Sequence, residues 1–421
     1  MKQIELVRGM RDLLPTATPL WRRVEDIARD CFAAYGYDEI RLPVVEKKVL
    51  FERQLGEHTD LVEKEMYSFA AGDNELVLRP EATVSTMRAV LSGGLHRKGL
   101  LRLWYGGPMF RRERPQKGRY RQFYQLGAEA VGSDSWAIDA EQIIMSARLW
   151  RNLGVGKRLC LHINNLGNTD ERRGYRERLR EHFRRFDSVL DETTRRRIDT
   201  NPLRILDSKD ESARAAIAKA PRLSAALGDD SRRHGERVKN AVAAAGVDFE
   251  ENETLVRGLD YYNLTVFEWV LSDDERRQNA VCGGGRYDGL AEQIGGPSLP
   301  GCGFALGLDR LVDLAAQCGL NADGRLQCYM AVMGDDNAAF ADTVAEDLRN
   351  AGLSVWRHVG GGNLARQLKK ANAGAATLAL LIGDEERTNQ EVTIKRLSDG
   401  CEQRAPLKLA ALQIKEMMNN G

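Results

Sequence analysis

The segment Phe110–Glu129 combines side chains that can hold a phosphoryl group beside an aromatic base. The apolar run Leu101–Phe110 and the β-prone run Gln122–Gly132 predict two paired strands joined by a polar hairpin loop. Because alternate side chains of a strand point to the same face, one set of side chains is expected to share a surface. That set is Arg111, Glu113, Phe123, Gln125 and Glu129.

Arginine suits a phosphoryl group because its planar fork donates two parallel charge-assisted hydrogen bonds and stays protonated at physiological pH. Phe123 offers a stacking surface for a base. The alternative is a basic surface hairpin, which is the usual interpretation of an isolated arginine-rich turn. Here arginines and carboxylates alternate on a strand pair beside an aromatic ring, an arrangement that is costly to bury without a ligand.

This segment resembles the second signature motif of class II aminoacyl-tRNA synthetases. Further segments narrow the resemblance to the histidyl-tRNA synthetase family. They are Gly36–Glu46, which resembles the first motif, Leu78–Thr83, Leu255–Tyr262, Gly283–Leu290, and Gly303–Leu311, which resembles the third motif. Leu255–Tyr262 and Gly283–Leu290 are the signatures peculiar to the histidine enzyme. One short motif would be weak evidence, but these motifs occur in the family's order along essentially the whole chain.

The resemblance implies an α+β protein. Its class II catalytic domain, built on an antiparallel sheet, would be interrupted by a helical insertion and followed by a C-terminal α/β anticodon-binding domain. The catalytic domain is expected at residues 1–169 and 248–322, the helical insertion domain at 170–247, and the anticodon-binding domain at 323–421.

Local patterns agree with this organisation. Apolar residues at helical spacing predict a helix over Pro15–Tyr35. A strand at Glu39–Glu46 follows, and its Pro43 indicates an edge position or a bend. From about Asp170 to Val247 the pattern is helical, alanine-rich and charged. After Asp323 strands alternate with helices, which predicts a small α/β domain with a largely parallel sheet.

Amino-acid activation requires the substrate carboxylate to attack the α-phosphorus of ATP, so positioning and electrostatic stabilisation do most of the catalysis. By resemblance, Arg111 and Arg257 are the catalytic cations at the α-phosphate. ATP would be held by Arg111, Glu113, Phe123 and Arg310, with Phe123 stacked on adenine. The alternative for Arg257 and Arg310 is a structural ion pair with an aspartate of the same motif, Asp260 or Asp309.

Histidine presents an ammonium group, a reacting carboxylate and a ring with two distinct nitrogens. The resemblance implies that Glu81, Thr83 and Gln125 bind the ammonium group, and that Glu129, Tyr262 and the nearby Tyr261 face the ring. A site that hydrogen-bonds both ring nitrogens rejects amino acids that lack them. Gly283–Gly285 would leave the wall of this site without side chains, or would form a turn.

A net charge of +1 provides no general attraction for RNA, so any RNA-binding surface must be local. The predicted contacts to the tRNA acceptor end are Arg114, Gln116, Lys117 and Arg119. A second candidate is the arginine-rich run Arg172–Phe186, for which a solvated amphipathic helix is an equally good interpretation.

Seven cysteines without a CxxC pair argue against a zinc site and a disulfide framework, and fit the reducing cytosol. No segment has the apolar length needed to cross a bilayer, so a cytoplasmic protein without membrane contact is expected. The resemblance implies ATP as a substrate, with Mg²⁺ accompanying it and no zinc. It also implies L-histidine and tRNA(His) as partners, and a homodimer built through the N-terminal helix and first-motif strand.

Three positions depart from the family pattern: Ala82, Arg112 and Asp309. Two alternatives to a histidyl-tRNA synthetase remain open at this point, a non-catalytic regulatory subunit of ATP phosphoribosyltransferase and a synthetase for another amino acid. No GxxxxGK[ST] loop occurs, and neither Gly283–Leu290 nor Gly303–Leu311 has GxGxxG spacing, so ATP would have to bind on an antiparallel sheet.

Overall fold

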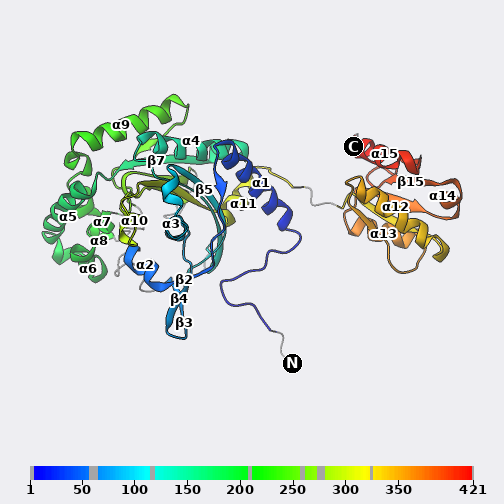
Figure 1. The fold of residues 1–421 in the computed structure, drawn as a ribbon, viewed down its shortest axis with the longest axis horizontal. Coiled ribbons are helices and arrows are strands. Elements are labelled where there is room, and N and C mark those ends of the chain that lie inside the picture. The colour runs from blue at the N-terminus through cyan, green and yellow to red at the C-terminus, as the bar shows by residue number, and fades with distance from the viewer. Residues whose placement is uncertain are drawn as a thin grey trace. The chain divides into compact units, whose positions relative to one another are not determined.

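The structure, a computed structural model, describes residues 4–55, 65–113, 119–206, 211–256, 261–272, 280–322 and 326–419. The chain folds into two compact units, Met1–Ala322 and Asp323–Gly421, and Figure 1 shows the elements of each. Among the described helices, none combines the length and the apolar character that crossing a membrane requires.

The first unit is built on an eight-stranded sheet in the order β1-β5-β6-β11-β10-β9-β7-β8. These strands are β1 (Asp38–Glu39), β5 (Leu101–Phe110), β6 (Gln122–Val131), β7 (Leu159–Asn165), β8 (Glu250–Glu251), β9 (Asn263–Leu271), β10 (Ala280–Arg286) and β11 (Gly301–Gly307). All pairs from β5 to β7 are antiparallel, and the outer pairs of this sheet as described, β1–β5 and β7–β8, are parallel. The predicted hairpin and antiparallel catalytic sheet are therefore confirmed.

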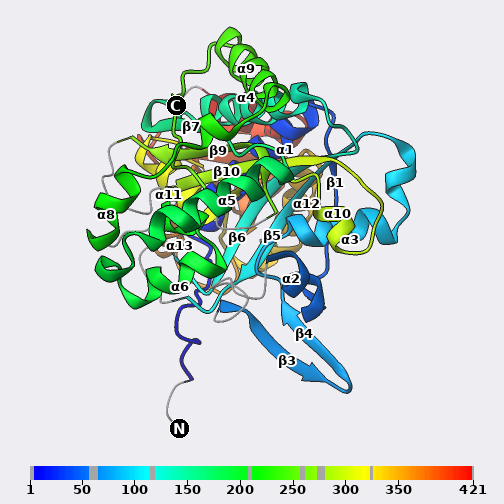
Figure 2. The ribbon, with the colours of Figure 1, turned by 90° about the vertical axis from the view of Figure 1, so that its left-hand side faces the viewer.

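Helices cover both faces of this sheet. One face packs against α1 (Thr18–Ala34), α4 (Trp136–Asn152), α9 (Asp229–Ala244) and α11 (Leu308–Gln317). The other face contributes to a second core with α2 (Lys48–Leu55), α3 (Thr83–Ser92), α5 (Thr169–Arg184), α6 (Glu192–Thr200), α7 (Leu203–Leu206), α8 (Glu211–Ala218) and α10 (Leu290–Gln293). In Figure 2, α5 and α6 lie in front of the sheet on this second face. Helices α5 to α8, from the segment predicted to be a helical insertion, thus share a core with the sheet.

Helix α5 carries the arginine-rich run. Its Tyr175, Leu179 and Phe183 are buried, and Arg180 pairs with Glu177 three residues earlier at 2.5 Å. The run is therefore an amphipathic helix with a buried apolar stripe, as predicted by the alternative to RNA contact.

The predicted single strand Glu39–Glu46 is wrong. It is divided between β1, which pairs with β5, and β2 (Val45–Lys47), which joins β4 (Asn74–Leu78) and β3 (Tyr67–Ala71) in a separate sheet. Proline lacks the N–H that would continue a ladder. The carbonyls of Leu42 and Pro43 instead accept hydrogen bonds from Nη1 of Arg79, at 2.9 and 3.4 Å. The β3–β4 hairpin extends from the rest of this unit (Figure 2).

The second unit has a five-stranded sheet in the order β13-β12-β14-β15-β16. Its elements are β12 (Cys328–Val332), α12 (Ala338–Asn350), β13 (Val355–Arg357), α13 (Leu364–Ala373), β14 (Leu378–Ile382), α14 (Asp384–Asn389), β15 (Glu391–Arg396), β16 (Glu402–Pro406) and α15 (Leu407–Asn419). β13, β12 and β14 are parallel, whereas β14–β15 and β15–β16 are antiparallel. The prediction of a largely parallel sheet is therefore wrong, because the short links to β15 and β16 cannot make a parallel crossover.

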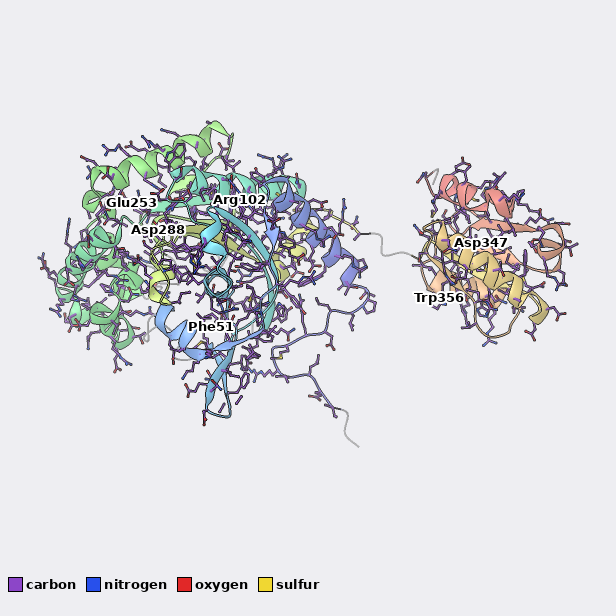
Figure 3. The ribbon with its side chains drawn as sticks, viewed as in Figure 1. Phe51, Arg102, Glu253, Asp288, Asp347 and Trp356 are labelled. Carbon is purple, nitrogen blue, oxygen red and sulfur yellow. The ribbon has the colours of Figure 1, made fainter. Side chains whose placement is uncertain are left out.

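Two local features of the second unit are the start of α13 and an exposed aromatic side chain on β13. Asn363 caps α13 by accepting a hydrogen bond from the N–H of Arg366 at 3.0 Å, so the glycines before it form a strand-to-helix connection. Trp356 on β13 leaves 53% of its surface exposed (Figure 3). An exposed tryptophan provides a flat apolar surface on this unit.

Candidate active site

A cavity of about 290 Å³ opens at the end of the β5–β6 hairpin. Its lining combines three arginines, two glutamates and two aromatic residues: Arg111, Glu113, Arg119, Tyr120, Phe123, Gln125, Glu268, Ala280, Gly307, Asp309 and Arg310. We call it the Arg111 cavity. All four residues predicted to bind ATP lie in this lining.

Arg111 is held in position at the mouth of the hairpin. Its Nε donates to the carbonyl of Pro80 at 3.0 Å, and its guanidinium carbon lies 5.3 Å from the centroid of the Phe123 ring. Glu113 accepts a hydrogen bond from Arg119 at 2.8 Å, while its other carboxylate oxygen lies 4.0 Å from Nη1 of Arg111. The cation and the aromatic face that could take a phosphate and a base are therefore adjacent.

Arg310 and Asp309 start α11 but have different partners. Nη1 of Arg310 donates to the carbonyl of Ala280 at 2.7 Å. Asp309 instead accepts from Arg11 at 2.7 Å and from the backbone N–H of Tyr124 at 2.8 Å. The predicted alternative of an Arg310–Asp309 ion pair is thus wrong.

Glu129 lies further along β6 and is almost completely buried. One carboxylate oxygen accepts from the hydroxyls of Thr83 at 2.7 Å and Tyr105 at 3.3 Å, and the other accepts from Tyr287 at 2.5 Å. Burial raises the pKa of Glu129 to about 8, although these hydroxyl donors favour the charged form. We call Glu129 and its three donors the Glu129 cluster.

Glycines in neighbouring strands make room for this cluster. A Cβ atom on Gly303 would lie 1.8 Å from a carboxylate oxygen of Glu129, and one on Gly127 would lie 2.3 Å from the Tyr105 hydroxyl. Gly283–Gly285 belong to β10, so the alternative that they form a turn is wrong. The glycine-rich strands therefore allow large polar side chains to lie close to the sheet.

Glu81 and Thr83 stand at the start of α3. The buried Glu81 carboxylate accepts from the N–H groups of Thr83 at 2.7 Å and Val84 at 3.0 Å, which caps the helix. Burial raises the pKa of Glu81. Two of the three side chains predicted to bind the ammonium group are therefore already hydrogen-bonded, Glu81 to the first N–H groups of α3 and Thr83 to Glu129.

Two buried polar atoms of the predicted site have no hydrogen-bond partner among the described residues: Oε1 of Gln125, which lines the Arg111 cavity, and the hydroxyl of Tyr261. The Tyr261 ring packs against Tyr262 and Tyr287, with centroids 4.7 and 5.8 Å away. An unsatisfied buried polar group costs about 1–3 kcal/mol, so a ligand that pairs with these atoms would recover that energy.

Some of the predicted site lies outside the described residues, namely Arg257, Arg114, Gln116 and Lys117. Other residues of the site were not predicted: Tyr105, Tyr120, Glu268 and Tyr287. Tyr287 stands inside the motif Gly283–Leu290, which could have identified it. Glu268 offers a weaker signal as the one acidic residue of the strand Asn263–Leu271.

Another residue of that motif, Arg286, has a structural position. It is fully buried, its Nε donates to Asp139 at 3.0 Å, and its Nη1 donates to Asp288 at 3.0 Å. A buried arginine paired on both sides holds β10 against α4.

Comparison with known proteins agrees with the family resemblance of the sequence motifs. The family described as histidyl-tRNA synthetase matches residues 9–311, and the one described as anticodon binding domain matches residues 327–417. The structure of apo histidyl-tRNA synthetase from S. aureus is 31% identical, with a TM-score of 0.82, and the match covers 98% of this chain and 100% of that one.

Two other solved structures share the fold at lower identity. Histidyl-tRNA synthetase from Nostoc sp. PCC 7120 is 22% identical, with a TM-score of 0.73 and coverage of 99% of this chain and 100% of that one. An ATP phosphoribosyltransferase regulatory subunit/histidyl-tRNA synthetase from Bacillus halodurans C is also 22% identical, with a TM-score of 0.65 and coverage of 88% and 97%. On the family matches and the S. aureus structure, this chain belongs to the histidyl-tRNA synthetase family of class II aminoacyl-tRNA synthetases and carries its anticodon-binding domain.

Proposed function

We propose that this protein is a histidine–tRNA ligase. It would activate L-histidine with ATP, giving histidyl-adenylate and pyrophosphate, and then transfer histidine to the 3′ end of tRNA(His). The observation that carries this proposal is the arrangement along β6. Phe123 and Gln125 line the Arg111 cavity, and Glu129 follows at the same strand periodicity in a buried cluster of hydroxyls.

The Arg111 cavity would take ATP. Arg111 would pair with the α-phosphate while adenine stacks on Phe123, and Arg310 would hold the remainder of the nucleotide. Arg257 would add the second cation at the α-phosphate. Mg²⁺ would accompany ATP, and Glu113 and Glu268 are the cavity carboxylates that could hold it, since hard cations prefer oxygen ligands.

The Glu129 cluster would take the histidine side chain. With a pKa of about 8, the Glu129 carboxyl can donate to a ring nitrogen when protonated and accept from a ring N–H when ionised. Tyr261 and Tyr262 would complete the ring site. Gln125, whose Oε1 has no partner among the described residues, would accept from the substrate ammonium group together with Glu81 and Thr83.

In the reaction, the histidine carboxylate would attack the α-phosphorus and pyrophosphate would leave. Arg111 and Arg257 would stabilise the negative charge that develops on the α-phosphoryl oxygens, which requires no covalent contribution from the protein. The hairpin loop with Arg114, Gln116, Lys117 and Arg119 would position the acceptor end, and the second unit would bind the anticodon. A cytoplasmic homodimer accords with the family and with seven free cysteines.

ATP–pyrophosphate exchange measured with each standard amino acid tests this proposal. Exchange with histidine alone, together with charging of tRNA(His), supports the ligase. Histidine binding without exchange would favour a regulatory role. The name of the Bacillus halodurans protein gives both roles, an ATP phosphoribosyltransferase regulatory subunit and a histidyl-tRNA synthetase. Exchange with another amino acid would contradict the proposed substrate.

A further inference from the structure

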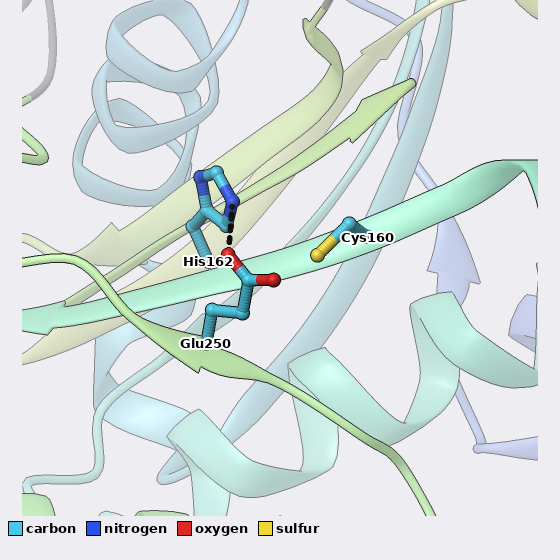
Figure 4. Close-up of side chains that lie close together, drawn as sticks. All are labelled: Cys160, His162 and Glu250. Atoms are coloured by element: carbon cyan, nitrogen blue, oxygen red, sulfur yellow. Dashed lines mark ion pairs between the residues drawn. The ribbon is translucent and has the colours of Figure 1, made fainter. Parts of the chain in front are cut away.

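A cysteine, a histidine and a glutamate meet at the edge of the eight-stranded sheet (Figure 4). Cys160 and His162 are two residues apart on β7, so they point to the same face. Glu250 on β8 is the register partner of His162 in the parallel pair. One ligand atom from each side chain lies within 4.8 Å of the other two, and Nε2 of His162 is 3.2 Å from a carboxylate oxygen of Glu250.

This cluster faces the same side of the sheet as the Arg111 cavity. Across the antiparallel pair β7–β9, His162 is the register partner of Glu268. Directly opposed residues of neighbouring strands point to the same face. Because Glu268 lines the Arg111 cavity, Cys160 and His162 stand one strand, and Glu250 two strands, farther toward the edge on that face.

We propose that Cys160, His162 and Glu250 form a binding site for a tetrahedral divalent cation, with Zn²⁺ as the preferred metal. Thiolate sulfur, imidazole nitrogen and carboxylate oxygen are the three ligand types that Zn²⁺ takes from proteins, and a water completes a three-residue site. The site is independent of the proposed ligase activity, since none of its side chains belongs to the Arg111 cavity or the Glu129 cluster.

The geometry permits such a site with small side-chain movements. Tetrahedral zinc with bond lengths of ~2.0–2.3 Å places its ligand atoms about 3.3–3.8 Å apart. The present spread of up to 4.8 Å must therefore close by about 1 Å. Rotation of the side chains can supply this movement, while β7 keeps Cys160 and His162 two residues apart on one face.

The metal-free cluster is electrostatically unfavourable for the thiolate. Burial and the nearby Glu250 carboxylate raise the pKa of the Cys160 thiol. A cation between the two groups would turn this repulsion into attraction, because both would then be ligands of the same positive charge. In the competing interpretation no metal is bound, and Glu250 pairs with His162 while it accepts a hydrogen bond from the Cys160 thiol.

A zinc site of this kind needs no cysteine pair with CxxC spacing, which is the pattern that the sequence lacks. The third ligand is far from the first two in sequence and reaches them only through the β7–β8 pairing. β8 has only two residues, and the segment after it is held by Asn164, whose Nδ2 donates to the carbonyls of Glu253 and Leu255 at 3.2 and 3.0 Å. A bound metal would therefore anchor β8 to β7.

The test uses the untagged full-length protein, freed of metal with a chelator and titrated with Co²⁺, which reports its ligands by absorption. We expect one Co²⁺ per chain, tetrahedral visible bands and a thiolate-to-cobalt charge-transfer band in the near ultraviolet, all removed by stoichiometric Zn²⁺. Cys160→Ser should abolish the charge-transfer band and weaken Co²⁺ binding by on the order of 100-fold. Losing a direct ligand should cost at least as much affinity as losing a residue that only hydrogen-bonds to a ligand. Cys401→Ser, which alters an exposed cysteine of the second unit, should change neither.

Glu250→Gln provides a second variant, because an exposed side chain can be replaced without disturbing folding. It should weaken Co²⁺ binding, whereas Glu251→Gln, at the neighbouring exposed residue paired with Lys239 at 2.8 Å, should not. Zn²⁺ should also raise the melting temperature of the wild type but not that of Cys160→Ser. Absence of stoichiometric binding, or a charge-transfer band that survives Cys160→Ser, would overturn the proposal.

Discussion

Arg11 and Asp309 form an ion pair of 2.7 Å between the N-terminal segment and the first turn of α11. The same guanidinium lies 4.2 Å from the centroid of the Tyr120 ring, which lines the Arg111 cavity. The other oxygen of Asp309 accepts from the N–H of Tyr124, the residue after Phe123. The N-terminal segment therefore helps to position one wall of the proposed ATP site.

Arg11→Ala should raise the KM for ATP about fivefold in the exchange reaction, because losing a partly exposed charged contact costs roughly 1 kcal/mol. The dissociation constant for histidine should not change, since Arg11 does not contact the Glu129 cluster. Arg29→Ala is a matched control, as it removes an exposed ion pair with Asp26 on α1. An equal effect of the two substitutions on ATP would rule out a specific role for Arg11.

Arg257→Ala should slow adenylation in single-turnover assays far more than it weakens ATP binding. Its charge is proposed to matter most as negative charge develops on the α-phosphoryl group. Arg257→Lys should restore only part of the rate because lysine lacks the planar fork. Unchanged adenylation in the alanine variant would remove Arg257 from the mechanism.

Glu129→Gln should raise the dissociation constant for histidine at least tenfold if the bound ring N–H donates to an ionised Glu129, because a charge-assisted hydrogen bond contributes about 1.5–3 kcal/mol. ATP affinity, measured by calorimetry on the same samples, should be retained. Glu46→Gln is the matched control, since Glu46 is also buried and pairs with Arg88 at 2.6 Å. Equal histidine affinity in wild type and Glu129→Gln would exclude Glu129 from the substrate site.

The raised pKa of Glu129 also predicts a pH dependence of stability. The folded protein binds this proton with a pKa of about 8, whereas the unfolded chain releases it near the ordinary value of 4.5. The contribution of Glu129 to the free energy of unfolding is therefore fully present below 4.5 and is lost as pH rises toward 8. Urea unfolding of the ligand-free protein across this range should show a steeper decline for wild type than for Glu129→Gln. Parallel curves would mean that Glu129 is ionised in the folded state.

Truncation after Ala322 should retain histidine-dependent ATP–pyrophosphate exchange, because every residue proposed for that step lies in the first unit. Transfer to tRNA should fall through weaker binding, as contacts of the second unit are lost. Circular dichroism and size-exclusion chromatography must first show that the truncated protein is folded and keeps the oligomeric state of the full chain. Charging as efficient as that of the full chain at low RNA concentration would contradict anticodon binding by the second unit.

The sequence by itself determined the elements whose patterns are local. The apolar run Leu101–Phe110 and the β-prone run Gln122–Val131 form the predicted hairpin, with Phe123 and Gln125 in one cavity. The family followed from the order of several motifs along the chain, because each combines residue types that rarely coincide by chance. The broken strand at Pro43 shows the limit, since its residues did not reveal which sheet each part would join.

Only the tertiary structure decided the features that depend on distant partners. The protonation of Glu129 depends on burial beneath Tyr105 and Tyr287, and the Arg11–Asp309 pair joins residues far apart in the chain. The cluster of Cys160, His162 and Glu250 likewise exists only because β8 pairs with β7. Desolvation and cross-strand contact are properties of the packed sheet, whereas a sequence pattern records only the periodicity of each strand.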